Sequence, residues 1–175
     1  VKKGFIENGT YFITGGLGKI GFTLCDYLAR KYSPTLIIVG RTALPAKDQW
    51  PALTEKNTTS SVWDKLQKIK HLEQQGAKVI YKSLDVTEEE ALKLFVKEVE
   101  IPHGKINGVI HSTAVIESVN FKTIAEANDS ICERHFEGKV YGLLSLANAI
   151  KDVDYDFCFL MSSISSVLGG IGYAA

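Results

Sequence analysis

The stretch TYFITGGLGKIG, residues 10–21, constrains the fold of this sequence more than any other feature. A β-branched and aromatic run, residues 10–15, leads into the pattern G-x-G-x-x-G formed by Gly16, Gly18 and Gly21. Residues 19–32 continue with Ile20, Leu24 and Leu28 at helical spacing. The order predicts a buried strand, a tight turn and a helix.

The same alternation continues along the chain. Apolar runs at residues 35–40, 78–85, 108–113 and 156–163 predict four more strands. Helices are predicted at 62–75, opened by a Ser61–Asp64 capping box and closed by Gly76, and at 88–99, opened by Thr87 with Glu90. One long helix is predicted from about residue 129 to 150. Residues 41–61 are predicted to form an elaborated surface loop.

Near-continuous apolar strands that alternate with helices predict an α/β domain, a parallel sheet covered by helices on both faces. At 175 residues the chain fits one domain, residues 1–175. Its 20 basic and 20 acidic residues balance, so no bulk charge indicates a nucleic acid or a membrane surface as partner. No apolar run has the length of a membrane span, and the N-terminus shows no signal-peptide core.

The histidines and cysteines show no metal-ligand spacing, so no metal site is expected. The three cysteines, Cys25, Cys132 and Cys158, lie far apart in apolar surroundings. They are interpreted as reduced core thiols, which agrees with a cytoplasmic location.

The glycine pattern lies between a predicted strand and a predicted helix, the context that a dinucleotide-binding turn requires. Glycines permit a positive φ and let the backbone approach a pyrophosphate, whose charge a helix N-terminus favours. The alternative is a glycine-rich turn that binds nothing. The predicted cofactor-binding residues of this segment are Thr14, Gly15, Gly16, Leu17, Gly18, Ile20 and Gly21.

The end of the second predicted strand indicates which dinucleotide binds. NAD-binding folds place an Asp or Glu there for the ribose 2′-hydroxyl, whereas this chain has Gly40-Arg41-Thr42. A guanidinium can bind a 2′-phosphate through two hydrogen bonds, and a carboxylate would repel it. The sequence therefore predicts NADP(H), with Arg41 at the 2′-phosphate. The alternative for Arg41 is a solvated loop charge.

Five segments in order resemble the ketoreductase domain of a modular polyketide synthase, in the short-chain dehydrogenase/reductase superfamily. They are TYFITGGLGKIG, GRTALP, LDVT, GVIHSTAV and GKVYGL…FLMSSISSVLGGIGYAA, and they span residues 10–175. The resemblance implies a Rossmann-type doubly wound sheet with strand order 3-2-1-4-5. It also implies that Asp85 and Val86 lie beside the adenine ring and that Thr113 and Ala114 lie against the cofactor. The alternatives are a helix-entry role for Asp85 and a packed strand position for His111.

In this superfamily a tyrosine donates a proton to the substrate carbonyl, a lysine tunes the tyrosine and a serine orients the same carbonyl. In the ketoreductase pattern the lysine precedes the serine by 24 positions, the spacing of Lys139 and Ser163 here. The resemblance implies that Lys139 also binds the nicotinamide ribose of the cofactor. The tyrosine follows the serine by 13 positions, which is position 176. Ser162, Ser165 and Ser166 are alternatives for the active hydroxyl whose spacing fits worse.

Tyr173 follows Ser163 by ten positions and is interpreted as a residue of the substrate loop, not as the proton donor. Family members of one stereochemical class carry Leu-Asp-Asp where this chain has Ile116-Glu117-Ser118. The opposite class carries a tryptophan where this chain has Leu168. The stereochemistry of the product is therefore left open.

The resemblance implies NADPH-dependent reduction of a β-ketoacyl thioester on an acyl carrier protein, within a larger synthase whose other domains are partners. It also implies that the catalytic subdomain is cut before its tyrosine and that its C-terminal elements are missing. One alternative is a non-catalytic scaffold domain, against which Lys139 and Ser163 argue. The other is a stand-alone NADP-dependent reductase or epimerase, which would normally carry Tyr-x-x-x-Lys on one helix.

Overall fold

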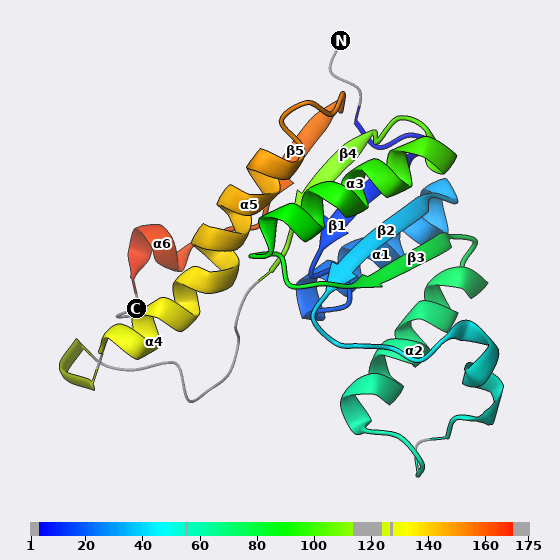
Figure 1. Ribbon diagram of the computed structural model, residues 1–175, viewed down its shortest axis with the longest axis horizontal. Helices are drawn as coiled ribbons and strands as arrows, with labels where there is room; N and C mark the ends of the chain where they lie inside the picture. The colour runs from blue at the N-terminus through cyan, green and yellow to red at the C-terminus, as the bar shows by residue number, and fades with distance from the viewer. Residues whose placement is uncertain (1–3, 55, 114–123, 127, 170–175) are drawn as a thin grey trace.

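The computed structural model describes residues 4–54, 56–113, 124–126 and 128–169 (Figure 1). Five parallel strands form one sheet in the order β3-β2-β1-β4-β5, which confirms the predicted Rossmann-type topology. The elements are β1 (Thr10–Thr14), α1 (Lys19–Tyr32), β2 (Thr35–Gly40), η1 (Lys47–Ala52), α2 (Ser60–Gln74), β3 (Lys78–Ser83), α3 (Glu89–His103), β4 (Gly108–His111), η3 (Ile124–Glu126), α4 (Asp129–Phe136), η4 (Glu137–Tyr141), α5 (Gly142–Ala149), β5 (Phe157–Leu160) and α6 (Ser165–Leu168).

Each face of the sheet carries its own apolar core. Successive strand residues point to opposite faces, so Tyr11 and Ile13 of β1 enter one cluster and Phe12 enters the other. The first cluster is completed by α1 and α2 and the second by α3 and α5. Figure 1 shows α3 in front of the strands and α1 behind them. This two-sided burial explains why the strands are nearly continuous apolar runs.

Helix α2 begins at Ser60, two residues before the start that its expected capping box gives. Thr59 is the N-cap, and its side chain accepts a hydrogen bond from the Val62 N–H at 3.4 Å, so the Ser61–Asp64 prediction is wrong. Lys65 Nζ instead donates to the Ser61 hydroxyl. The expected stop at Gly76 is confirmed: its φ is +101°, and Ala77 N–H bonds the Leu72 carbonyl in a Schellman arrangement.

Helix α3 also differs from its predicted bounds. Its N-cap is Glu88, and Thr87 lies outside the helix, where its N–H and hydroxyl both bond the Asp85 carboxylate, so the Thr87–Glu90 capping box is wrong. The helix continues past the predicted end to His103 and includes Pro102 in its last turns. Thr87 does not cap the helix because its N–H and hydroxyl are already bonded to the carboxylate of Asp85, two residues before it.

The predicted surface loop between β2 and α2 is partly built into the core. It contains η1, in which Trp50 is only 8% exposed and belongs to the cluster under α1 and α2. The Trp50 indole N–H donates to the Pro45 carbonyl at 2.8 Å. The interpretation of this segment as a plain surface loop is therefore corrected, because one buried indole anchors it.

The long helix predicted for residues 129–150 is present as α4, η4 and α5 in succession. Its middle section, η4, is a π-helical turn that carries Lys139. Such turns hold one extra residue and are frequent at functional sites. The spacing of apolar residues did not predict this turn.

The cysteines are less uniform than expected. All three are free, but only Cys25 is buried, and Cys158 on β5 is exposed. The interpretation of all three as core thiols is thus wrong for Cys158. Among the described strands β5 pairs with β4 alone, and Phe159 and Leu160 are 46% and 47% exposed.

Candidate functional site

A cleft of about 260 Å³ lies at the carboxyl ends of the strands. The strand order reverses between β1 and β4, and ligands of doubly wound sheets bind at this switch point. Segments from four strands, α2 and η4 meet there. The lining residues are Gly15, Leu17, Gly18, Val39, Gly40, Arg41, Thr42, Lys65, Tyr81, Leu84, Asp85, Val86, Ser112, Thr113, Glu137 and Gly138.

The glycine turn at one wall of the cleft depends on the absence of side chains. Gly15 has a φ of +72°, and a Cβ there would lie 2.7 Å from the Ser112 carbonyl oxygen. A Cβ on Gly21 would lie 2.4 Å from the Gly15 oxygen. Gly18 is the N-cap of α1 and offers no side-chain cap, so the first N–H groups of the helix face the turn. The geometry suits an anionic group.

The predicted residues of this turn divide into two groups. Gly15, Leu17 and Gly18 line the cleft. Thr14, Gly16, Ile20 and Gly21 are not among its lining residues. Thr14 is fully buried, and a Cβ on Gly16 would press on methyl groups of Ile13 and Ile38, so Thr14 and Gly16 support the turn from behind, whereas the Ile20 side chain is exposed.

The segment after β2 is fixed by side chains of β3. Tyr81 donates its hydroxyl to the carbonyls of Gly40 (3.1 Å) and Thr42 (2.8 Å). The Ser83 hydroxyl donates to the Arg41 carbonyl. Burial raises the pKa of Tyr81 to about 12, so its phenol stays protonated and keeps donating. The backbone at Arg41 is therefore fixed by hydrogen bonds from Tyr81 to the residues before and after it and from Ser83 to Arg41 itself.

Asp85 and Val86 also line the cleft, but Asp85 is engaged in the turn before α3 through Thr87. Val86 is 5% exposed and packs closely on α5, since a Cβ on Gly142 would lie 2.5 Å from its Cγ1. The helix-entry alternative for Asp85 is thus present in the structure alongside its place in the cleft.

His111 connects the end of β1 to the π-helical turn η4. It is 4% exposed, its Nδ1 lies 2.8 Å from the Thr14 hydroxyl, and its Nε2 lies 2.9 Å from the Gly138 carbonyl. Burial lowers the pKa of His111, so the ring is neutral near pH 7. The carbonyl accepts only, so Nε2 carries the proton and Nδ1 accepts from Thr14. The packed strand position expected for His111 is confirmed.

The π-helical turn lies against the end of β4. Gly138 allows the approach, because a Cβ there would meet the Thr113 methyl at 2.9 Å. Thr113 lines the cleft, and Ala114 lies outside the described residues. Lys139 is exposed, with its ammonium 3.5 Å from His135 Nδ1. It follows directly after two cleft residues, Glu137 and Gly138.

Ser163 lies three positions beyond the end of β5, and its side chain is exposed. Neither it nor Lys139 is among the residues that line the cleft. The Ser166 hydroxyl donates to the Ser163 carbonyl at 2.6 Å, which engages one of the alternative hydroxyls in its own turn. Position 173 and residues 116–118 lie outside the described residues, and Leu168 is a 75% exposed residue of α6.

Sequence reasoning missed several lining residues, above all Lys65 and Tyr81. Tyr81 stands in an apolar strand run, and Lys65 stands on a polar helix face, so neither shows a local signal. In the described part of the chain, no group of three or more His, Cys, Asp or Glu side chains could hold a metal ion. Among the described helices none has the length and hydropathy to cross a bilayer.

Comparison with known proteins gives consistent matches. The family model of the KR domain matches residues 9–175. Polyketide synthase PksN of Bacillus subtilis (strain 168) is 35% identical over 169 residues, which are 96% of this chain and 3% of that protein. The 6-methylsalicylic acid synthase of Aspergillus terreus is 32% identical over 169 residues, 95% of this chain and 9% of that protein. The chain thus spans less than a tenth of these relatives.

Two solved structures agree with the fold. The N-terminal ketoreductase of the macrolactin assembly line superposes with a TM-score of 0.77 at 30% identity, covering 99% of this chain and 33% of that one. A ketoreductase domain of the bacillaene assembly line superposes with a TM-score of 0.79 at 27% identity, covering 99% of this chain and 37% of that one.

Proposed function

The chain belongs to the KR-domain family, the ketoreductase domains of polyketide synthases, and we propose that it is part of a domain that reduces a β-ketoacyl thioester with NADPH. The thioester would be presented by an acyl carrier protein, and the other domains of the same synthase would be its partners. The observation that carries the proposal is the cleft at the strand switch point, with a glycine turn at one wall and Arg41 in place of an acid.

The described residues fit a dinucleotide with a 2′-phosphate. The glycine turn leaves room for a pyrophosphate beside backbone N–H groups that lack partners in the helix. Arg41 follows β2 where an NAD-binding fold would carry a carboxylate, and its backbone is fixed by Tyr81 and Ser83. When bound, NADPH supplies the hydride for the β-carbon of the substrate.

The remaining roles are proposed for residues of the chain itself. Ser163 would donate a hydrogen bond to the β-keto oxygen and hold it in place while negative charge develops there. Lys139 would lie beside the phenol that gives its proton to that oxygen, and its positive charge would lower the pKa of the phenol. The product is the β-hydroxyacyl thioester. The spacing in the family pattern places that phenol at position 176, and this placement is part of the proposal.

The cofactor assignment is tested by titrating the protein with NADPH and with NADH by isothermal calorimetry. NADPH should bind much more tightly, and Arg41→Ala should remove most of the difference, since one charge-assisted hydrogen bond contributes about 1.5–3 kcal/mol. Lys151→Ala, a change on an exposed residue that does not line the cleft, is the matched control. Equal affinities for the two dinucleotides in the unmutated protein would exclude the NADP(H) assignment.

A further inference from the structure

Helix α2 brings a second cation to the cleft. The helix runs from the carboxyl edge of the sheet, where β2 ends, back to the start of β3, so its first turns lie near the cleft. Lys65, in the second turn, lines the cleft together with Arg41 and Thr42. No feature of the sequence assigned a role to this lysine.

The position of Lys65 is fixed because α2 is docked firmly on its neighbours. Three α2 side chains, Leu66, Ile69 and Leu72, are fully buried in the core. One turn after Lys65, Lys68 Nζ donates to the Leu17 carbonyl of the glycine turn at 3.1 Å. The helix that carries Lys65 is thus tied directly to the proposed pyrophosphate site.

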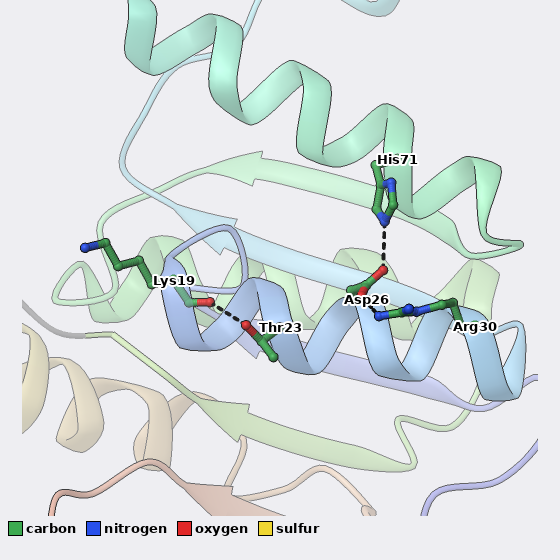
Figure 2. Close-up of polar contacts among 5 residues, drawn as sticks. All are labelled: Lys19, Thr23, Asp26, Arg30 and His71. Atoms are coloured by element: carbon green, nitrogen blue, oxygen red, sulfur yellow. Dashed lines mark hydrogen bonds and ion pairs between the residues drawn. The ribbon is translucent and has the colours of Figure 1, made fainter.

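A second contact joins α2 to α1 further along. Figure 2 shows Asp26 of α1 between two partners, with the His71 ring of α2 above it and Arg30 of its own helix beside it. His71 Nε2 lies 2.8 Å from one Asp26 oxygen, and Arg30 pairs with the other. These two contacts, one turn apart, fix α2 against the glycine turn and against α1, and Lys65 lies one turn before the first of them.

The charge of Lys65 is not neutralised within the described part of the chain. Its ammonium donates to the neutral Ser61 hydroxyl at 3.0 Å, and none of the ion pairs there includes Lys65 or Arg41. Lys68, by contrast, pairs with Asp64 at 2.8 Å. The cleft therefore has two cations without carboxylate partners, from α2 and from the end of β2, as a doubly charged anion requires.

We propose that Lys65 binds the 2′-phosphate together with Arg41 and is a determinant of the choice of NADPH over NADH. The proposal rests on the proposed function, because it assumes that a dinucleotide occupies the cleft. Arg41 would supply planar, paired hydrogen bonds, and Lys65 would supply a point charge from α2. Exchange of the Ser61 hydroxyl for a phosphate oxygen would leave the lysine hydrogen-bonded throughout.

The experiment uses two small probes, adenosine 2′,5′-bisphosphate and 5′-AMP, which differ only in the 2′-phosphate. Calorimetric affinities are measured for the unmutated protein and for Lys65→Ala, Lys65→Arg, Arg41→Ala and the double variant. Lys70→Ala, on the same helix but over the Trp63 ring, is the matched control. Thermal melting of each variant without ligand checks that folding is unchanged.

Lys65→Ala should weaken the bisphosphate about fivefold, as expected for one partly exposed charged contact, and leave 5′-AMP within about twofold. Lys65→Arg should restore the loss, Lys70→Ala should have no effect, and raising the salt should reduce the difference. An equal loss for both probes would place Lys65 at the 5′-phosphate and overturn the proposal, as would no loss for either. If the unmutated protein binds both probes with equal affinity, the NADP(H) assignment and the proposed role of Lys65 are both wrong. If only Arg41→Ala weakens binding of the bisphosphate, the NADP(H) assignment stands and the proposed role of Lys65 is wrong.

Discussion

At the scale of single residues, His111 shows how one buried side chain joins distant parts of the site. Its two ring nitrogens bond the end of β1 through Thr14 and the π-helical turn through Gly138. Because the ring is neutral, both bonds have a defined direction. The glycine turn and the helix that carries Lys139 are thereby held at a fixed separation.

This arrangement predicts a loss of stability in acid. The pKa of His111 is lowered in the folded protein, whereas it is about 6.5 in the unfolded chain. The unfolded state therefore binds more protons below that value, and stability, complete above about pH 6.5, falls as the pH drops toward the folded pKa. His111→Gln should make the free energy of unfolding less dependent on pH between pH 7 and 5, as measured by urea denaturation.

The control for that measurement is Gln49→Ala, a change at an exposed residue that does not titrate, which should keep the pH dependence of the unmutated protein. An identical pH dependence for His111→Gln and the unmutated protein would show that protonation of His111 does not contribute.

A second prediction for a single residue concerns Ser163, the proposed hydrogen-bond donor to the β-keto oxygen. In a polypeptide that continues this chain through the expected tyrosine, Ser163→Ala should lower turnover of a β-ketoacyl thioester about a hundredfold or more, because one donor to the developing charge is lost. NADPH affinity should stay nearly constant. Ser165→Ala is the matched variant and should be mild. The opposite ranking of the two variants would mean that the register of the serines is assigned wrongly.

At the scale of elements, the helix formed by α4, η4 and α5 packs on the sheet through two glycines. Gly138 faces Thr113 and Gly142 faces Val86, in both cases at distances that leave no room for a methyl group. Gly138 belongs to the π-helical turn and Gly142 follows it directly, and the turn adds one residue to the local helical repeat. The close approach and the extra residue together determine where Lys139 leaves the helix.

Gly142→Ala tests this packing. Alanine favours a helix over glycine by about 1 kcal/mol, so an exposed site would gain stability. Here the added methyl would overlap Val86, and overpacking costs about 1–3 kcal/mol, so we expect no gain or a net loss of unfolding free energy. Gly4→Ala, where nothing lies within 4 Å, is the control. A gain in stability at Gly142 equal to the helix propensity would contradict the tight contact.

At the scale of the whole molecule, cofactor binding and the proposed reaction require different residues. The described residues supply the glycine turn, Arg41 and the turn that carries Lys139. The family pattern places the proton donor three positions beyond Tyr173. Proton transfer requires hydrogen-bond reach, and an offset of three residues moves a side chain by several ångströms.

Residues 1–175 taken alone should therefore bind NADPH without turning over a β-ketoacyl thioester. The measurement is a paired assay by NADPH absorbance of this chain and of one about sixty residues longer, with calorimetric binding as the positive signal. If the shorter chain turns over the thioester and Tyr173→Phe abolishes this turnover, Tyr173 is the proton donor.

The sequence by itself determined the five strands, the glycine turn and the place of Arg41, and the order of the strands came from the family resemblance. The strands, the glycine turn and the place of Arg41 follow from local rules, because alternation predicts strands and helices, glycine alone tolerates the turn, and the end of a strand fixes the edge where a residue emerges. The π-helical turn, the burial of Trp50, the clamp of Tyr81 on the Arg41 segment and the approach of Lys65 were decided only in the tertiary structure. Each depends on contacts between residues far apart in the chain, so no local pattern of residues encodes it.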